Sequence, residues 1–142
     1  MKSLKQLLEA KGGRVYSIRP DAKVIEALQL MAQKDVGALL VMEGARLAGI
    51  MSERDYARKV ILQGKSSQDL AVRDIMTADV IRVDPSQTVE ECMGLMTQHR
   101  VRHLPVCEGD KLMGLVSIGD LVKEVIAEQE QTIKQLESYI HS

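Results

Sequence analysis

The sequence predicts an α/β protein built from two tandem β-α-β-β-α repeats, with one helix before the first repeat and an extended helix after the second. A shift of 65 residues aligns residues 15–61 with residues 80–126 without a gap, and 18 of the 47 aligned positions are identical. The matches include residues that govern backbone geometry: Pro20 with Pro85, Gly44 with Gly109 and Gly49 with Gly114. A copy of about 50 residues buries too little surface to be stable alone, so we expect the two to pack together as one module.

The composition excludes several classes of protein. With 45% hydrophobic residues and no Phe or Trp, the core must be aliphatic, which argues against a ligand cage of aromatic rings. A net charge of −1 argues against nucleic-acid binding by counterion release, so any anion site must be local. No apolar run approaches the roughly 20 residues of a membrane span, so we expect no membrane association. Cys92 and Cys107 make no disulfide framework, and we expect a cytoplasmic protein.

Each copy predicts the same elements in the same order. Short β-branched runs at residues 15–18 and 80–83 predict strands that end before a proline. A helix follows in each copy, with its apolar face on the i, i+3, i+4, i+7 pattern: Val24, Ala27, Leu28 and Met31, or Val89, Cys92, Met93 and Met96. Two apolar runs around a Gly-containing turn predict a β-hairpin, at residues 39–51 and 104–116. A second helix then begins at a capping serine, over residues 52–62 and 117–127.

The flanking segments complete a division into four parts. Residues 1–14 predict an amphipathic helix with Leu4, Leu7 and Leu8 on one face and Gly12-Gly13 as its end. Residues 15–69 form the first repeat with its polar linker, residues 70–127 the second, and residues 128–142 a helical extension. Apolar or long side chains recur along that extension at heptad-like spacing: Gln129, Ile133, Leu136 and Ile140. This stripe either docks within the chain, for instance on the N-terminal helix, or forms a dimer contact, which we favour.

A Gly-x-x-Ser-x-x-Asp motif occurs once in each copy, as GIMSERD (residues 49–55) and GLVSIGD (residues 114–120). Each lies where a strand ends and a helix begins, and the N–H groups of a helix N-terminus suit a phosphate. A serine hydroxyl adds a hydrogen bond, and a carboxylate one turn later can accept from a ribose diol. The motif therefore indicates a nucleotide. Ser-x-x-Asp is also a capping-box pattern, which the spacing alone favours, and duplication does not decide because a copied cap also appears twice.

Basic residues lie near both motifs. The first copy carries Arg54, Arg58 and Lys59, and the second can draw on Arg100, Arg102 and His103. Either set could hold an anion or form a solvated face. His99, His103 and Cys107 are spaced by four, but the turn before Pro105 argues against a shared helical face, so we predict no metal site. Because no nucleophile–base pair stands out, we also predict no catalytic residues and no enzyme activity.

Residues 15–127 resemble a tandem pair of CBS domains, often called a Bateman module. The resemblance rests on GIMSERD and GLVSIGD, on HRVRHLPV (residues 99–106), and on AVRDIMT (residues 71–77) before the second copy. SERDYARKVILQGKSS (residues 52–67) is similar to stand-alone bacterial CBS pairs. The resemblance implies a pseudo-twofold module that binds AMP, ADP, ATP, NAD(H) or S-adenosylmethionine in clefts between the repeats. It further implies a homodimer and a regulated protein that the sequence does not name.

The resemblance also assigns site residues. One ligand would have its phosphate and ribose on Ser117 and Asp120, with its base near Thr77, Val80, Arg102, His103, Leu104 and Pro105. The other would use Ser52, Arg54 and Asp55, lined by Tyr16, Gly37, Ala38 and Leu39. The first copy has GALL where the second has RHLP, so its base contacts are less defined. We therefore expect a non-catalytic adenine-nucleotide sensor; a structural dimerisation or adaptor module is the alternative.

Overall fold

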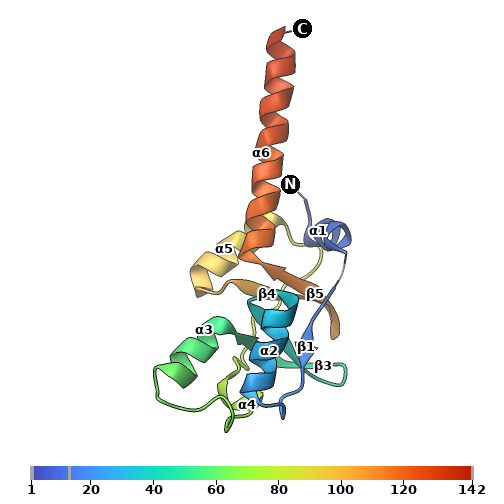
Figure 1. The fold of residues 1–142 in the computed structure, drawn as a ribbon. Coiled ribbons are helices and arrows are strands. Elements are labelled where there is room, and N and C mark those ends of the chain that lie inside the picture. The colour runs from blue at the N-terminus through green and yellow to red at the C-terminus, as the bar shows by residue number, and fades with distance from the viewer. Residues whose placement is uncertain (1, 13, 142) are drawn as a thin grey trace. The chain divides into compact units, whose positions relative to one another are not determined.

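The computed structural model describes residues 2–12 and 14–141 (Figure 1). In chain order the elements are α1 (Leu4–Lys11), β1 (Ser17–Ile18), α2 (Val24–Lys34), β2 (Ala38–Glu43), β3 (Arg46–Ser52), α3 (Glu53–Tyr56), the π-helical η1 (Ala57–Ile61), α4 (Val72–Ile75), α5 (Val89–His99), β4 (His103–Glu108), β5 (Lys111–Ser117) and α6 (Ile118–His141). The described residues divide into two compact units. The repeat-1 unit contains residues 14–81 and 109–112, and the repeat-2 unit contains residues 2–12, 82–108 and 113–141.

The repeat-1 unit holds a three-stranded sheet in the order β1-β2-β3. Strand β1 runs parallel to β2, with Ser17 opposite Leu40, and β2 runs antiparallel to β3. Gly44 turns the hairpin at a φ of 58°, a left-handed conformation that favours glycine. The predicted hairpin is confirmed. The predicted strand at 15–18 is shorter than expected and covers Ser17–Ile18, but it ends before Pro20 as predicted.

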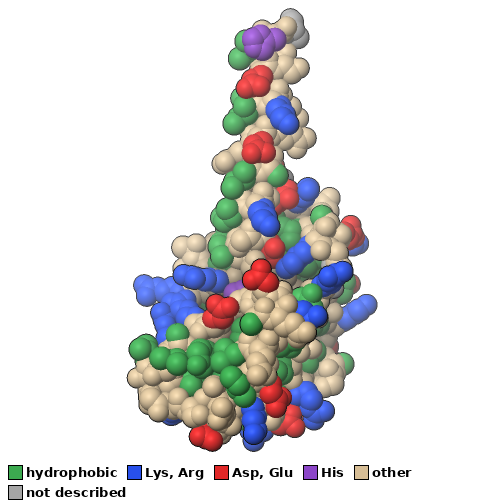
Figure 2. Space-filling model, viewed as in Figure 1, with side chains coloured by type: hydrophobic (Ala, Val, Ile, Leu, Met, Phe, Trp, Pro, Cys, Tyr) green, Lys and Arg blue, Asp and Glu red, His purple; other side chains and the backbone are tan. Residues whose placement is uncertain are grey.

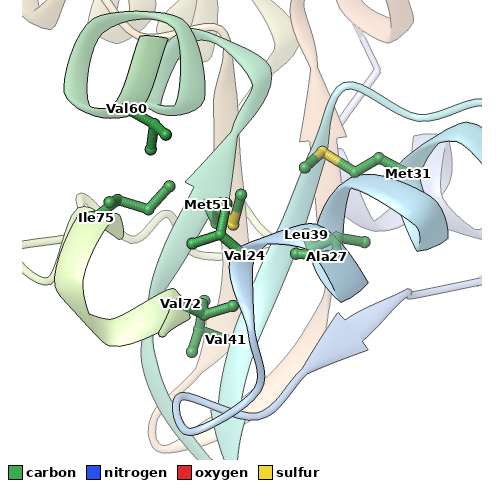
Figure 3. Close-up of a cluster of buried hydrophobic side chains, with 9 residues drawn as sticks. All are labelled: Val24, Ala27, Met31, Leu39, Val41, Met51, Val60, Val72 and Ile75. Atoms are coloured by element: carbon green, nitrogen blue, oxygen red, sulfur yellow. The ribbon is translucent and has the colours of Figure 1, made fainter. Parts of the chain in front are cut away.

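The core of the repeat-1 unit is aliphatic, as the composition predicts (Figure 3). The predicted face of α2 is confirmed: it buries Val24, Ala27 and Met31, with Leu28 partly buried. This face packs with residues of β2, β3, η1 and α4, namely Leu39, Val41, Met51, Val60, Val72 and Ile75. Full burial of one such side chain contributes about 1.5–3 kcal/mol, so the cluster is a main source of the unit's stability.

The repeat-2 unit contains the β4–β5 hairpin but lacks the strand predicted at residues 80–83, which is therefore wrong. Only Val83 pairs with β4, through a parallel bridge to Val106. In the first repeat, the N–H of Leu40 donates to the carbonyl of Tyr16 at 3.2 Å, which extends the ladder by one bond. The position equivalent to Leu40 is Pro105, which has no N–H, so the matching bond cannot form.

Each repeat is preceded by a short helix that belongs to the unit of the other repeat. Helix α1 precedes the aligned residues 15–61 of the first repeat but lies in the repeat-2 unit. Helix α4 precedes the aligned residues 80–126 of the second repeat but lies in the repeat-1 unit. The 65-residue shift places α4 on residues 7–10 of α1, so the two helices are equivalent. We call them the lead helices. The predicted α1 is confirmed, with Leu4, Leu7 and Leu8 buried and Gly12 at a φ of 91° after its last residue.

The two lead helices, or the residues that directly follow them, pack against equivalent glycines. A Cβ built on Gly114 would lie 2.7 Å from Cδ2 of Leu8 in α1. A Cβ on Gly49 would lie 2.6 Å from the carbonyl oxygen of Thr77, just after α4. Both distances are too short for any other residue without a shift, so the matched glycines allow each lead segment to lie directly on a strand.

Helix α6 is continuous over 24 residues, and its apolar stripe is exposed along the C-terminal half. The exposed fractions of Ile133, Leu136 and Ile140 are 54%, 58% and 75%. Figure 2 shows hydrophobic side chains in a row along this helix, between charged ones. Within the described residues of the repeat-2 unit the stripe therefore docks on neither α1 nor another element, so the interpretation that it packs on the N-terminal helix is wrong. None of the described helices combines the length and hydrophobicity needed to span a membrane.

Candidate functional site

The motif of the first repeat forms a capping box at the junction of β3 and α3. The N–H of Asp55 donates to Oγ of Ser52 at 3.1 Å, and the N–H of Ser52 donates to Oδ2 of Asp55 at 3.0 Å. The Ser52 hydroxyl also donates to the same Oδ2 at 3.0 Å. The capping interpretation of Ser-x-x-Asp is thus correct as geometry.

The other oxygen of Asp55 faces two further side chains. Its Oδ1 lies 3.2 Å from Nζ of Lys59 and accepts from Oγ1 of Thr77 at 3.4 Å. Lys59 also donates to the carbonyl of Ile75 at 2.9 Å. One carboxylate, two hydroxyls and one ammonium therefore gather at the start of α3, in a region where the Asp55 side chain is only 14% exposed.

Thr77, which we expected to lie near the ligand of Asp120, lies beside Asp55. The cause is a pair of backbone hydrogen bonds. The N–H of Ile50 donates to the carbonyl of Thr77 at 3.0 Å, and the N–H of Thr77 donates to the carbonyl of Ile50 at 2.8 Å. This bridge adds the segment after α4 to the edge of β3. Thr77 and Val80 both belong to the repeat-1 unit, and the half-buried Val80 follows Thr77 by three residues.

The motif of the second repeat forms the same box at the junction of β5 and α6. The N–H of Asp120 donates to Oγ of Ser117 at 3.2 Å, and the N–H of Ser117 donates to Oδ2 of Asp120 at 2.8 Å. That Oδ2 also accepts from Nζ of Lys11 at 2.8 Å, and Lys11 donates to the carbonyl of Leu115 at 3.0 Å. Burial acts to raise the pKa of Asp120, but the hydrogen bonds from Lys11 and Ser117 outweigh it and hold this pKa below its usual value.

His103 and Arg102 lie close to this second site. Burial lowers the pKa of His103, with a smaller opposing effect from Asp120, so its imidazole is neutral at pH 7. The carbonyl of Arg102 accepts from the N–H of Ile118 at 2.9 Å, which ties the start of β4 to the start of α6. The equivalent bond in the first repeat joins Gly37 to Glu53 at 3.0 Å. Both motifs are therefore positioned by the residue that precedes the first strand of their hairpin.

The remaining predicted residues divide between the two units. The repeat-1 unit holds Tyr16, Gly37, Ala38, Leu39 and Arg54; the repeat-2 unit holds Leu104 and Pro105. Ala38, Leu39, Leu104 and Pro105 are buried, so their side chains belong to the core, whereas Arg54 is exposed. Lys34 lies over the ring of Tyr16, 5.5 Å from its centroid.

Lys11 was not among the predicted site residues, although the sequence carries a signal for it. It lies three residues after Leu8 and seven after Leu4, on the face by which α1 docks. Lys59 was noted only as part of a basic run. A lysine that continues an apolar helical face predicts that its ammonium lies near the surface on which the helix docks, but not which carboxylate it meets.

The described residues show no group of three or more His, Cys, Asp or Glu side chains that could hold a metal ion. Cys92 and Cys107 are buried free thiols. Burial raises the pKa of Cys92 to about 11, with a smaller contribution from Glu91, and also raises the pKa of Cys107. Thiolate chemistry at neutral pH is therefore suppressed at both positions.

The fold and the duplicated motif together define a tandem pair of homologous modules. The CBS domain family matches residues 13–61 and 72–127, and the chain belongs to this family. It is 45% identical over 125 residues to the CBS domain-containing protein CBSX3, mitochondrial, of Arabidopsis thaliana, covering 84% of this chain and 61% of that protein. It is 34% identical to the CBS domain-containing protein YhcV of Bacillus subtilis, covering 76% of each.

A solved structure agrees with this placement. A CBS-domain protein from Burkholderia ambifaria is 54% identical, with a TM-score of 0.87 over 90% of this chain and 96% of that one. The predicted family and fold class are confirmed. The site residues within each unit stay predictions, because the geometry shows how they are arranged and not what they bind.

Proposed function

We propose that this protein is a non-catalytic sensor of adenine nucleotides with one binding site in each unit. The observation that carries the proposal is the convergence of a lysine on the motif aspartate in both units: Lys59 on Asp55, and Lys11 on Asp120. Each site then offers a carboxylate for the ribose diol, and a serine hydroxyl and an ammonium for phosphate.

This convergence separates a ligand site from a copied helix cap. Duplication explains Ser52 with Ser117 and Asp55 with Asp120, because these positions are related by the 65-residue shift. It does not explain the lysines, since the shift places Lys59 on Glu124 and Lys11 on Met76. A helix cap needs only the serine and the aspartate. Two lysines at positions that the duplication does not relate therefore lie at equivalent carboxylates. This favours a functional reason for a positive charge at each site.

The ligand class follows from the donors and from the composition. Because the chain has no Phe or Trp, a base would rest on aliphatic side chains and backbone groups. We assign Thr77, Val80, Tyr16 and the segment Gly37–Leu39 to the Asp55 site, and the segment Arg102–Pro105 to the Asp120 site. A neighbour of the same fold, the CBS domain pair of MJ0100, was solved with 5'-methylthioadenosine and S-adenosyl-L-methionine; at 19% identity it supports only the order in which ligands are tested.

A thermal-shift panel tests the proposal with AMP, ADP, ATP, NAD, NADH and S-adenosylmethionine. A ligand at 100 times its Kd stabilises by about 2.7 kcal/mol, which raises Tm by about 5–10 °C for a chain of this size. Asp55→Ala and Asp120→Ala should each remove one site, whereas Asp110→Ala, at an exposed hairpin position, should remove neither. If no ligand moves Tm at millimolar concentration, the sensor proposal fails. Assaying the same mixtures for nucleotide turnover checks that the protein is not an enzyme.

The exposed stripe of α6 favours a second role, in assembly. We propose a homodimer in which two α6 helices pair in parallel, with Ile126, Ile133 and Ile140 at one heptad position and Val122, Gln129 and Leu136 at the other. Isoleucine at all three residues of the first position and leucine at Leu136 of the second match the pattern of two-stranded coiled coils. Glu130 and Glu137 flank the stripe on one side and would face each other in an antiparallel pair. An adaptor without a physiological nucleotide would depend on this helix alone, and truncation after Ala127 separates the two roles.

A further inference from the structure

Lys11 is carried to Asp120 by a helix that is anchored along its length. Helix α1 begins with a capping box between Ser3 and Gln6, and the N–H of Leu4 donates to the carbonyl of Gln87 at 2.9 Å. Leu4, Leu7 and Leu8 are buried, and Leu8 lies against Gly114 on β5. Lys11 closes the last turn on the same face. Its ammonium is therefore placed by packing, whereas a lysine on a loose terminus would have no fixed partner.

The contact that Lys11 makes competes with the proposed ligand. Oδ2 of Asp120 accepts from both Lys11 and the Ser117 N–H, and a ribose diol would bind the same carboxylate. The Lys11 side chain is 37% exposed and the Asp120 side chain 21%, so the ammonium can leave the carboxylate while α1 stays docked. A lysine ammonium on a flexible four-carbon stem can then reach a phosphate next to the ribose.

We propose that Lys11 is a specificity residue of the Asp120 site: it pairs with Asp120 when the site is empty and transfers to the ligand's phosphate when a nucleotide binds. This inference rests on the proposed function and deepens it. When AMP binds, the Lys11–Asp120 ion pair is replaced by an ion pair between Lys11 and the phosphate. When adenosine binds, the Lys11–Asp120 pair is broken and no new ion pair forms. The site thus selects AMP over adenosine, and the selection depends on a residue that lies outside both repeats.

Isothermal titration with AMP and with adenosine tests this in an Asp55→Ala background, where only the Asp120 site remains. With Lys11 present, AMP should bind more tightly than adenosine. Lys11→Met should weaken AMP by about tenfold, the usual size of one lost charge-assisted hydrogen bond, and leave adenosine unchanged or tighter. Lys11→Arg should retain the preference. Lys5→Met, at an exposed position on the same helix, should change neither affinity.

The possible outcomes distinguish this inference from the proposed function. If the Lys11 protein binds neither AMP nor adenosine, nor any other nucleotide of the thermal-shift panel, the sensor proposal itself is wrong for this site. If it binds another of these nucleotides, that nucleotide and its unphosphorylated nucleoside replace AMP and adenosine in the comparison. If it binds AMP and Lys11→Met weakens AMP and adenosine equally, Lys11 has a structural role only and the specificity inference is overturned. It is overturned equally if Lys11→Met changes neither affinity.

Discussion

The ammonium of Lys11 lies 2.8 Å from Oδ2 of Asp120, although 109 positions separate the two residues in the chain. The contact joins the end of α1 to the first turn of α6. It makes the charge state of a motif carboxylate in the second repeat depend on a residue that precedes the first.

The Lys11–Asp120 pair should stabilise the protein at neutral pH and lose that effect in acid. Because the pKa of Asp120 is lowered from 3.8 in the folded protein, the unfolded chain binds the proton more readily, so stability falls as pH drops through that lowered pKa. Lys11→Met should shrink the difference between the free energies of unfolding at neutral pH and near pH 3.5, by up to about 1 kcal/mol for a partly exposed pair. Urea denaturation measures this; an unchanged difference would contradict the pairing.

His103 should make the fold less stable under mild acid. Burial lowers its pKa from 6.5, so the folded protein holds it neutral while the unfolded chain takes up a proton. Stability is then full above pH 6.5 and declines as pH falls towards the lowered pKa. The groups that act on it are Asp120, Lys11 and Arg102. His103→Gln should flatten the profile of Tm between about pH 7.5 and 5, whereas the same change at exposed His99 should leave it as it is.

The two matched glycines should tolerate alanine to different degrees. At Gly49 the new Cβ would meet a backbone oxygen at 2.6 Å, and at Gly114 the end of the Leu8 side chain at 2.7 Å. We expect Gly49→Ala to cost more than Gly114→Ala, with overpacking penalties of about 1–3 kcal/mol. Gly94→Ala, in α5 with open space around it, should be neutral or stabilise by up to about 1 kcal/mol. The Leu8→Ala change should reduce the destabilisation caused by Gly114→Ala but not that caused by Gly49→Ala. If the destabilisations by Leu8→Ala and Gly114→Ala simply add in the double variant, the Leu8–Gly114 contact is wrong.

Both cysteines should be slow to react in the folded protein. With the pKa of Cys92 raised to about 11 by burial, almost no thiolate exists at pH 8. A disulfide reagent should modify two thiols quickly in denaturant and neither quickly without it. Rapid native reaction at Cys92 would show that its burial is incorrect.

Pairing through α6 should depend on its apolar stripe. Ile133→Asn with Leu136→Asn should convert a dimer to monomers in analytical ultracentrifugation, whereas Gln135→Asn with Glu128→Gln, off the stripe, should not. A dimer that survives the first pair of changes would place the interface elsewhere. A hexamer, the assembly described for a CBS-CP12 protein from cyanobacteria that is 29% identical, would also contradict simple pairing.

Local patterns predicted most of the elements, because helical faces and hairpin turns are set by neighbouring residues. The face of α2 and the turn at Gly44 are examples. What failed depended on partners far along the chain. The strand at 80–83 has the composition of its counterpart, yet it is lost because Pro105, on another strand, cannot donate. The position of Thr77 beside Asp55 was likewise not predicted, because only its bridge to Ile50 shows which strand it joins.

The arrangement of the candidate site residues was also predictable only where it is local in the sequence. Ser52 with Asp55 and Ser117 with Asp120 are recognisable because the two residues of each pair lie within one helical turn. Lys11 is not, since nothing in 109 positions of separation indicates which carboxylate it meets. A single pattern of three leucines predicts the helix and its docked face but not the surface on which it docks.

The exchanged lead helices give the duplication a different meaning. A single ancestral repeat with its own lead helix would have completed a unit only by lending that helix to a second chain, which is a domain-swapped dimer. In the present chain the same exchange of lead helices is intramolecular and does not depend on protein concentration. Cutting the chain at the polar linker would make it intermolecular, so that neither half carries a complete set of site residues until it meets the other.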